Sequence, residues 1–278
     1  QVAEGQRTLL CASILKKLKM QQLKLLKTSL MLQMQQLLVV LAVDIAGQQA
    51  LLDSHVLIIG AGGLGSPASM YLAAAGVGKL TLVDNDTVEL SNLQRQLAHA
   101  ESDLGANKVD SAAATLRAIN SDVEVVALNR RVGTAELGEL VSSADVVLDA
   151  TDNVETRFAI NRACLAAKVP LVSGAAIRLE GQIAVFDSRQ SDSPCYECLY
   201  KGGEGGDLTC ADNGVLAPVV GIIGSMQALE ALKLIAQFGD TLVGRLLLFD
   251  ASSMQWREMK LPRDPNCLAC GTIEVSPA

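Results

Sequence analysis

The sequence contains few aromatic residues and no excess of basic ones. Aromatic side chains make up 3% of the 278 residues, and the histidines are His55 and His99. The 23 Lys and Arg residues are outnumbered by 30 Asp and Glu residues, which gives a net charge of −7 at pH 7. Because a protein whose main partner is nucleic acid usually presents a basic face, this balance argues against that class. With half of its residues hydrophobic, the chain is long enough for one large or two small domains.

The N-terminal region lacks acidic residues and also lacks an apolar run long enough to cross a membrane. No Asp or Glu occurs from Gly5 to Val43, and the uncharged run Thr28–Val43 has 16 residues, several of them glutamine. A spanning helix needs about 20 apolar residues, so we expect no membrane partner. Since Leu, Met and Gln favour helices, residues 1–45 are predicted to form a helical extension that packs on protein. An organelle transit segment is the alternative, although Arg and Ser are sparse.

Seven cysteines are too few for a disulfide scaffold at this length. Four of them form two CxxC pairs that lie far apart in the chain, and the others are isolated. In a reducing cytosol such pairs more often bind zinc than form bridges, and four thiolates make a closed, structural zinc site. Two independent redox pairs are the alternative. The paired cysteines are Cys195, Cys198, Cys267 and Cys270, and the isolated ones are Cys11, Cys164 and Cys210.

The stretch "SHVLIIGAGGLGSPASMYLAAAGVGKLTLVDND" predicts a strand, a glycine turn, a helix and a second strand. Val56–Ile59 is a continuous apolar run, as in a strand buried on both faces. Gly60, Gly62 and Gly65 satisfy GxGxxG, and the helix predicted over Ser66–Ala75 would point its N-terminal amides at a phosphate. The second strand, Leu80–Val83, ends in an acid placed to hold a ribose hydroxyl. This pattern alone is equally compatible with NAD, FAD or ATP.

The residues after the second strand favour a triphosphate. Ser91–Arg95 is a polar segment with amide and guanidinium donors, and Lys108 begins the next predicted helix. Arg and Lys beside a glycine turn supply more positive charge than a pyrophosphate bridge needs, and they suit a leaving pyrophosphate. A solvated loop and helix face is the alternative. Neither histidine completes an evident hydride-transfer site, and we expect both to be surface or capping residues.

A third apolar strand is predicted at Val146–Leu148, followed by Asp149, Asp152 and Asn153. Ligands of open parallel sheets bind beyond the carboxyl ends of the strands. A carboxylate there is placed to hold Mg²⁺ against phosphates. Asp152 or Asn153 can also cap the following helix, and both roles can hold at once.

The chain from about Ala46 to Gly271 closely resembles the adenylyltransferases that activate ubiquitin-like sulfur-carrier proteins in molybdopterin and thiamine biosynthesis. These are relatives of the ubiquitin-activating enzymes. The resemblance rests on "GAGGLGSP", "DTVELSNLQRQ", "DATDN", "VPLVSGAAIRLEGQIAVF", the paired CxxC and "LTCADNGVLAPVVGIIGSMQALEALKL", in this order. It implies an α/β fold: a Rossmann-like doubly wound sheet, largely parallel with an antiparallel extension. The domain is expected over 46–278, including a crossover loop over 187–215 and a zinc-bound tail.

The resemblance assigns roles to individual residues. It implies ATP and Mg²⁺ as substrate and cofactor, one structural Zn²⁺ held by the four paired cysteines, and a thioester or persulfide role for Cys210 in later chemistry. Arg95, Lys108 and Asp152 are the expected catalytic residues, with Cys210 as the fourth candidate. The expected nucleotide contacts are Gly63, Asp84, Ser91, Asn92, Leu93, Gln94, Arg95, Lys108, Asp152 and Asn153.

The implied reaction is adenylation of the C-terminal glycine carboxylate of a carrier that ends in Gly-Gly, with release of pyrophosphate. A homodimer, a sulfurtransferase as a further partner and a cytoplasmic location go with it. A non-catalytic binder of a ubiquitin-like protein and an NAD- or FAD-dependent oxidoreductase are the alternatives. The sequence departs from the family at one place. Gln33 and Gln36 occupy positions where members have arginines, one of which reaches the partner subunit's ATP.

Overall fold

A computed structural model describes residues 43–201 and 214–271. The chain divides into two units, Gln1–Ile45 and Ala46–Ala278, and the second unit contains an eight-stranded sheet. Its strands follow the spatial order β3-β2-β1-β4-β5-β6-β7-β8. Their bounds are β1 His55–Ile59, β2 Lys79–Val83, β3 Glu124–Leu128, β4 Val146–Asp149, β5 Leu171–Ile177, β6 Glu180–Phe186, β7 Arg245–Asp250 and β8 Gln255–Lys260.

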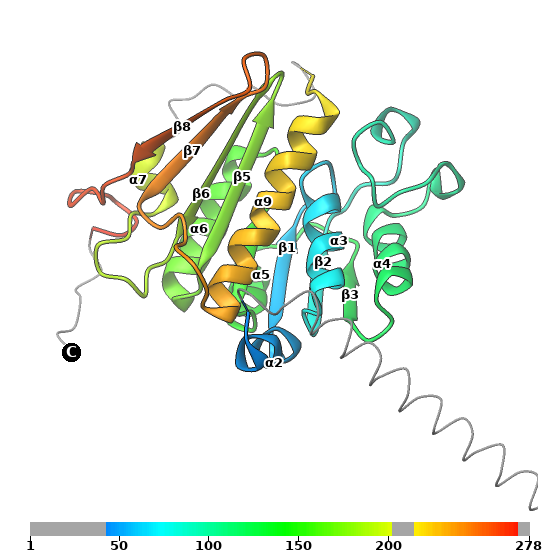
Figure 1. Ribbon diagram of the computed structural model, residues 1–278, viewed down its shortest axis with the longest axis horizontal. Coiled ribbons are helices and arrows are strands. Elements are labelled where there is room, and N and C mark those ends of the chain that lie inside the picture. Colours follow the sequence, from blue (N-terminus) through cyan, green and yellow to red (C-terminus); the bar gives the residue numbers. More distant parts are fainter. Residues whose placement is uncertain (1–42, 202–213, 272–278) are drawn as a thin grey trace, which may run out of the picture. The chain divides into compact units, whose positions relative to one another are not determined.

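Helices cover both faces of the sheet. Figure 1 shows α3, α4 and α9 on one face, with α5 and α6 behind the strands. The helices are α2 Ile45–Asp53, α3 Gly65–Ala75, α4 Lys108–Ile119, α5 Thr134–Ser142, α6 Val154–Ala167, α7 Tyr196–Leu199 and α9 Ala217–Ala236. Short 3₁₀ turns lie at Leu90–Asn92 and Glu101–Asp103.

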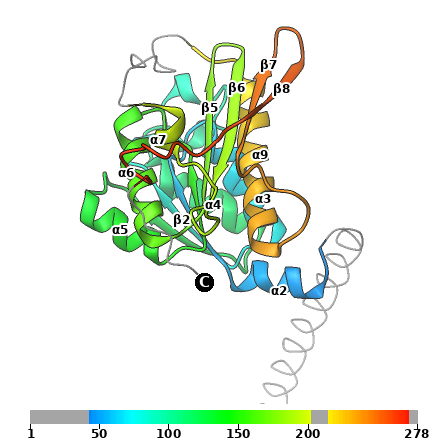
Figure 2. The same ribbon diagram turned by 90° about the vertical axis from the view of Figure 1, so that its left-hand side faces the viewer.

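The predicted fold class is confirmed. Strands β3, β2, β1, β4 and β5 are paired in parallel, whereas β5 to β8 are paired antiparallel. The β5–β6 and β7–β8 hairpins stand side by side in the turned view (Figure 2). After β1 the chain continues to β2 and β3 on one side, and then returns to β4 on the other side of β1. Ligands of such sheets bind at this reversal, beyond the carboxyl ends of the strands.

The burial of β1 explains its continuous apolar sequence. Val56 and Ile58 pack into the core shared with α3, α4 and α9, while Leu57 and Ile59 pack into the core shared with α5 and α6. Because successive side chains of a strand point to opposite faces, a strand covered on both sides needs apolar residues throughout. All four residues are buried, as predicted.

The helix α9 is strongly apolar, and its charged residues are Glu230 and Lys233. It is the one helix in the described residues that is long and apolar enough, by length and composition, to cross a membrane. In the structure it packs along the sheet, where Val219, Ile223, Ala228 and Ala231 are buried. Burial in the core therefore explains the length and hydropathy of α9. It does not explain the apolar side chains that α9 exposes on its outer side.

Candidate active site

A cavity of about 1480 Å³ lies at the carboxyl ends of β1, β2 and β4. Ile59 and Val83, the last residues of β1 and β2, contribute to its lining, as do the residues that follow β4. The cavity continues over β6, β7 and β8, where Gln182, Phe249 and Arg257 line it. The reversal of strand order therefore positions one continuous depression that joins the glycine turn to the antiparallel half of the sheet.

The glycine turn between β1 and α3 requires glycine at two positions. Gly60 has a φ of 101°, and a Cβ there would lie 2.6 Å from the carbonyl oxygen of Ala150. A Cβ at Gly65 would lie 1.9 Å from the carbonyl oxygen of Gly60, so a side chain there would push helix and turn apart. Gly63, one of the predicted nucleotide contacts, lines the cavity and lies just before the start of α3. The turn is therefore closed as tightly as a dinucleotide- or ATP-binding turn requires.

Asp84 connects the end of β2 to this turn. Its carboxylate accepts hydrogen bonds from the backbone N–H of Ala61 at 2.8 Å and of Asp86 at 2.9 Å. Each oxygen keeps a further acceptor position, and Asp84 lines the cavity. The structure therefore fixes this carboxylate at the place where the sequence predicts a ribose contact.

His99 supports the same turn from the other side. One ring nitrogen lies 3.2 Å from the carbonyl oxygen of Ala61, and the other lies 2.9 Å from the hydroxyl of Ser111. Burial lowers the pKa of His99 below its usual value. The expectation that both histidines are surface or capping residues is wrong for His99, which is buried. A single histidine in a loop carries no sequence signal of such a contact.

The predicted segment from Ser91 to Arg95 is only partly directed at the cavity. Arg95 and Asn92 line it, and the Arg95 guanidinium also donates to the carbonyl oxygen of Ser91 at 3.0 Å. The structure does not bring Ser91, Leu93 and Gln94 into the lining of the cavity. Gln96, which the sequence analysis did not select, lines the cavity instead. A 3₁₀ turn rather than a strand sets this pattern, so alternation along the segment does not predict it.

Lys108 lies at the first residue of α4 and reaches toward the end of β2. Its ammonium group donates to the Asp86 carboxylate at 2.8 Å, with 8% of the lysine side chain exposed and 58% of the aspartate side chain exposed. Both residues line the cavity. Asp86 is largely open to solvent, whereas Lys108 is buried. The ammonium group of Lys108 therefore lies at the wall of the cavity, beside the position expected for phosphates.

Asp149, at the end of β4, and Asp152 and Asn153, which follow it, have different surroundings. Asn153 is the N-cap of α6, because its side-chain oxygen accepts the N–H of Thr156 at 2.8 Å. Asp149 is 1% exposed, and its carboxylate faces inward, toward Ser173 and Thr151. Asp152 is exposed and lines the cavity. Of the two carboxylates, Asp152, the predicted magnesium-binding residue, lines the cavity, whereas Asp149 does not.

Arg157 is a site residue that the sequence analysis missed. Its guanidinium lies 3.2 Å from the buried carboxylate of Asp149 and donates to the carbonyl oxygen of Thr151. Asp149 also accepts the N–H of Thr151 at 3.1 Å, so this pair holds the residue before Asp152 from both sides. An arginine in the first turns of a helix is ordinarily solvent-exposed, and nothing in its spacing distinguishes this one.

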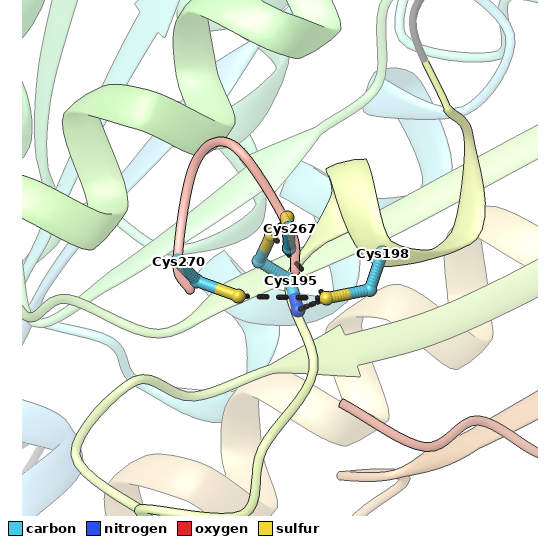
Figure 3. A group of neighbouring side chains, drawn as sticks. All are labelled: Cys195, Cys198, Cys267 and Cys270. Carbon is cyan, nitrogen blue, oxygen red and sulfur yellow. Dashed lines mark hydrogen bonds between the residues drawn. The ribbon is translucent and has the colours of Figure 1, made fainter. Parts of the chain in front are cut away.

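The four paired cysteines come together beside α7 (Figure 3). The sulfur atoms of Cys195 and Cys198 are 3.8 Å apart, those of Cys195 and Cys267 are 3.6 Å apart, and those of Cys198 and Cys270 are 3.4 Å apart. All four sulfurs lie within 4.8 Å of one another. A tetrahedral zinc ion with Zn–S bonds of about 2.3 Å separates its sulfurs by about 3.8 Å, so the four residues fit this metal.

The surroundings of the sulfurs shift their ionisation in opposite directions. Burial raises the pKa of Cys195 and raises that of Cys270 to about 11, whereas backbone hydrogen bonds from Cys270 and Ala269 outweigh burial and lower that of Cys267. The backbone N–H groups of Cys195 and Asp264 point at the sulfur of Cys198, each at 3.4 Å. Since buried thiols resist ionisation, a bound dication would favour the thiolate forms that ligate it. In contrast, Cys164 is buried alone in the core, away from this cluster.

Cys210, Gln33 and Gln36 lie outside the described residues, so their roles stay predictions. The crossover loop expected over 187–215 is described only at its two ends. On the first of these, Lys201 forms an ion pair of 3.0 Å with Asp264, next to the cysteine cluster.

Residues 34–269 match the model of the ThiF family. The chain belongs to the ThiF family. It is 53% identical over 228 residues to the molybdopterin-synthase adenylyltransferase of Escherichia coli, which covers 82% of this chain and 91% of the relative. It is 45% identical over 236 residues to the sulfur carrier protein ThiS adenylyltransferase of the same organism, covering 84% and 93%. The predicted family is confirmed.

A solved structure supports the fold independently. The crystal structure of Escherichia coli MccB with ATP superposes with a TM-score of 0.72 at 24% identity, over 82% of this chain and 69% of that chain. At this identity the likeness concerns the fold alone. This ThiF-family chain therefore shares its fold with MccB.

Proposed function

We propose that this protein adenylates the C-terminal glycine carboxylate of a small ubiquitin-like sulfur-carrier protein. Its ThiF-family relatives are named as adenylyltransferases of molybdopterin synthase and of ThiS, at identities of 53% and 45%. The observation that carries the proposal is the placement of Arg95, Lys108 and Asp152 around one cavity that also contains the glycine turn. Two cations and a free carboxylate suit a Mg·ATP complex, whose triphosphate needs both.

The proposed reaction needs no protein nucleophile. A carboxylate oxygen of the carrier attacks the α-phosphorus of ATP, a new P–O bond forms, and the bond to pyrophosphate breaks. Arg95 and Lys108 neutralise the charge that grows on the leaving pyrophosphate, and their fixed positions supply the orientation. Asp152 would hold Mg²⁺, which neutralises phosphate charge when bound. Asp84, at the end of β2, would bind the ribose.

The antiparallel half of the cavity is the proposed entry for the carrier's C-terminus. A volume of about 1480 Å³ exceeds the usual range of about 300–1,000 Å³ for a small-molecule site, so ATP leaves part of it free. Tyr196, Tyr200 and Lys201, on the first described part of the crossover loop, line this part. A thin Gly-Gly tail suits such a channel because it has no side chains. Cys210 would serve only later thioester or persulfide chemistry, where a sulfurtransferase would deliver the sulfur.

The four cysteines are proposed to hold one structural Zn²⁺. Such a site is closed by its protein ligands and leaves no position for a substrate. The metal would tie the first part of the crossover loop to the C-terminal segment, and it would take no part in the adenylation. A cytoplasmic location would agree with thiolate ligands that must stay reduced.

The protein is proposed to act as a homodimer. One side of α9 carries an apolar stripe of Ile222 and Met226, both half-buried against the core, and Leu229, which is 44% exposed; Tyr71 of α3 is 58% exposed. Large apolar side chains that gather at a surface are typical of an interface. A second copy of the chain would cover this stripe, and closed two-fold pairs are the commonest oligomers.

The deciding experiment is pyrophosphate exchange into ATP with purified protein. The sulfur-carrier subunit of molybdopterin synthase and ThiS are added in separate reactions, each paired with a variant that lacks the last glycine. Exchange that requires an intact carrier, together with the mass of the acyl-adenylate, supports the proposal. ATP and carrier binding without exchange would indicate a non-catalytic binder. Binding of NAD or FAD in place of ATP would indicate an oxidoreductase.

A further inference from the structure

A chain of three short contacts runs from the glycine turn through His99 to the surface. The ring atom Nε2 lies 3.2 Å from the carbonyl oxygen of Ala61, and Nδ1 lies 2.9 Å from the hydroxyl of Ser111. That hydroxyl lies 2.8 Å from a carboxylate oxygen of Asp103. His99 and Ser111 are buried, and neither they nor Asp103 line the cavity. The chain can therefore act on the cavity only through Ala61.

The number of protons in this chain depends on the charge of His99. Each contact needs one proton, because two bare acceptors repel each other, and a neutral imidazole and a serine supply two between them. Asp103 does not supply the third, because the backbone N–H of Ala100, 2.8 Å from its carboxylate, lowers the pKa of Asp103 and keeps it ionised. All three contacts are hydrogen bonds only when both ring nitrogens of His99 carry a proton.

With a neutral ring, the contact to Ala61 is the one without a proton. Ser111 donates to Asp103, so its oxygen accepts the proton of Nδ1, and Nε2 then turns a lone pair toward the Ala61 carbonyl. This contact is also the longest of the three. The Ala61 oxygen then keeps only the Ser66 hydroxyl, at 3.4 Å. Protonation of His99 therefore decides whether the ring holds this residue.

Ala61 connects His99 to the proposed ribose contact. It lies between the first two glycines of the turn, and its N–H donates to the Asp84 carboxylate at 2.8 Å. A protonated His99 would hold the carbonyl end of Ala61 while Asp84 holds the amide end. A shift of Ala61 would move the Asp84 carboxylate and the backbone of Gly62, and both residues line the cavity.

Charged groups face the ring from several elements. Burial, the largest effect, lowers the pKa of His99, and Lys108 of α4 acts in the same direction. Asp103 and Asp84 act in the opposite direction. Since the usual pKa of histidine is about 6.5, the ring of the free protein is mainly neutral at pH 7 and above. A polyphosphate beside Lys108 would offset its charge, and added negative charge favours the protonated ring.

We propose that His99 is a proton-linked positioning residue: when Mg·ATP binds, the ring takes a proton from solvent and bonds the Ala61 carbonyl, which fixes the glycine turn. No bond of the nucleotide is made or broken in this step. The inference rests on the proposed function, because it needs a nucleotide polyphosphate in the cavity. By linkage, a ligand whose binding takes up a proton binds more tightly at lower pH.

NMR titration of the ring signals tests the proposal directly, because His55 and His99 are the two histidines of the chain. Saturating Mg·ATP should raise the pKa of His99 by about one unit. The pKa of His55 should not change, since its ring bonds Ser143 and Thr81 and does not line the cavity. A His99 pKa that is the same with and without Mg·ATP would overturn the inference.

Calorimetry with a variant that cannot titrate gives a second test. Between pH 8 and pH 6, in excess Mg²⁺, the Kd of Mg·ATP for the wild type should fall about threefold to tenfold. The Kd of adenosine, which carries no phosphate charge, should stay within about twofold. His99→Gln keeps an N–H donor but has no ionisable ring, so its Kd for Mg·ATP should not depend on pH. His55→Gln is the matched control and should retain the pH dependence of the wild type.

The outcomes separate this inference from the function on which it rests. If the wild type binds no ATP at either pH, the proposed function itself fails. ATP binding with the same pH dependence in wild type and His99→Gln removes only the role of His99. An equal loss of ATP and adenosine affinity in His99→Gln, with no pH dependence in the wild type, would indicate a purely structural role and would also overturn the inference. If His99→Gln does not fold, the NMR titration of the wild type decides.

Discussion

The adjacent residues Asp152 and Asn153 after β4 are both candidates for capping α6 and for contacting a ligand. The structure gives them different positions. Asn153 caps α6, and Asp152 remains directed at the cavity. We expect Asp152→Ala to lower pyrophosphate exchange by about 100-fold or more, because a metal-binding carboxylate is lost where charge develops. The Tm should hardly change, since no hydrogen bond of the Asp152 side chain supports the described part of the fold.

Asn153→Ala is the matched comparison for Asp152→Ala. It removes the cap that accepts the Thr156 N–H and should cost about 1 kcal/mol of unfolding free energy, measured by urea denaturation. If Asp152→Ala destabilises the protein as much as Asn153→Ala does, while exchange per folded molecule is unchanged, the metal role is wrong.

The sequence identified the residues that touch the cavity better than those that support it. Gly63, Asp84, Arg95, Lys108 and Asp152 all line the cavity. All but Arg95 lie closely after a strand or at the start of a helix at the expected edge of the sheet, and Arg95 follows a 3₁₀ turn. The supporting residues are set by packing between distant segments, and local spacing carries no trace of it. Arg157 is buried with Asp149, and His99 is buried against Ala61.

At the scale of elements, the contact of α9 with α3 depends on one glycine. A Cβ at Gly224 would lie 2.3 Å from the carbonyl oxygen of Leu64, next to the glycine turn. Gly224→Ala should lower the unfolding free energy by about 1–3 kcal/mol through overpacking, measured by urea denaturation. Gly138 of α5 has nothing within 4 Å of its Cβ position, so Gly138→Ala should stabilise the protein by about 0.5–1 kcal/mol. Equal effects of the two variants would refute this account of the packing.

The cysteine cluster joins two segments that the sheet does not hold. Tyr196 and Glu197 of α7 are bonded to Asn161 and Arg162 of α6, so the first cysteine pair is anchored to the fold. The second pair lies after β8, where Arg263 donates to the carbonyl oxygens of Ser191 and Cys270, and where the proposed zinc would add a further constraint. We expect Cys267→Ser to remove the zinc measured by metal analysis and to speed proteolysis near the C-terminus.

Cys164 provides the control for the zinc prediction, because it is buried in the core without other cysteines nearby. Cys164→Ala should retain one zinc ion per chain even if it lowers the Tm. Protein prepared without chelators that contains no zinc would contradict the assignment of the metal.

Three of the five strands in the parallel part of the sheet were predictable to within a residue, whereas β3 and β5 were not identified from the sequence. Val56–Ile59, Leu80–Val83 and Val146–Leu148 each lie within an observed strand, because strands buried on both faces have continuous apolar sequences. β8 shows why the antiparallel half was available only from the resemblance. All of its residues are exposed, its sequence "QWREMK" alternates weakly, and its place follows from pairing with β7.

For the whole molecule, the outward stripe of α9 is the feature that one protomer does not explain. Leu229→Glu places a charge in the middle of this stripe and should convert a dimer of twice the 29.2 kDa chain mass into a monomer by light scattering. Met254→Glu, at an exposed position (71%) in the β7–β8 turn, is the control and should leave the mass unchanged. A wild-type monomer that sediments with lipid vesicles would show that a membrane covers the stripe instead. If the dimer forms as proposed, Leu229→Glu should also lower the rate of pyrophosphate exchange. The size of that loss would measure how much the partner's N-terminal segment, which carries Gln36, contributes to each ATP site.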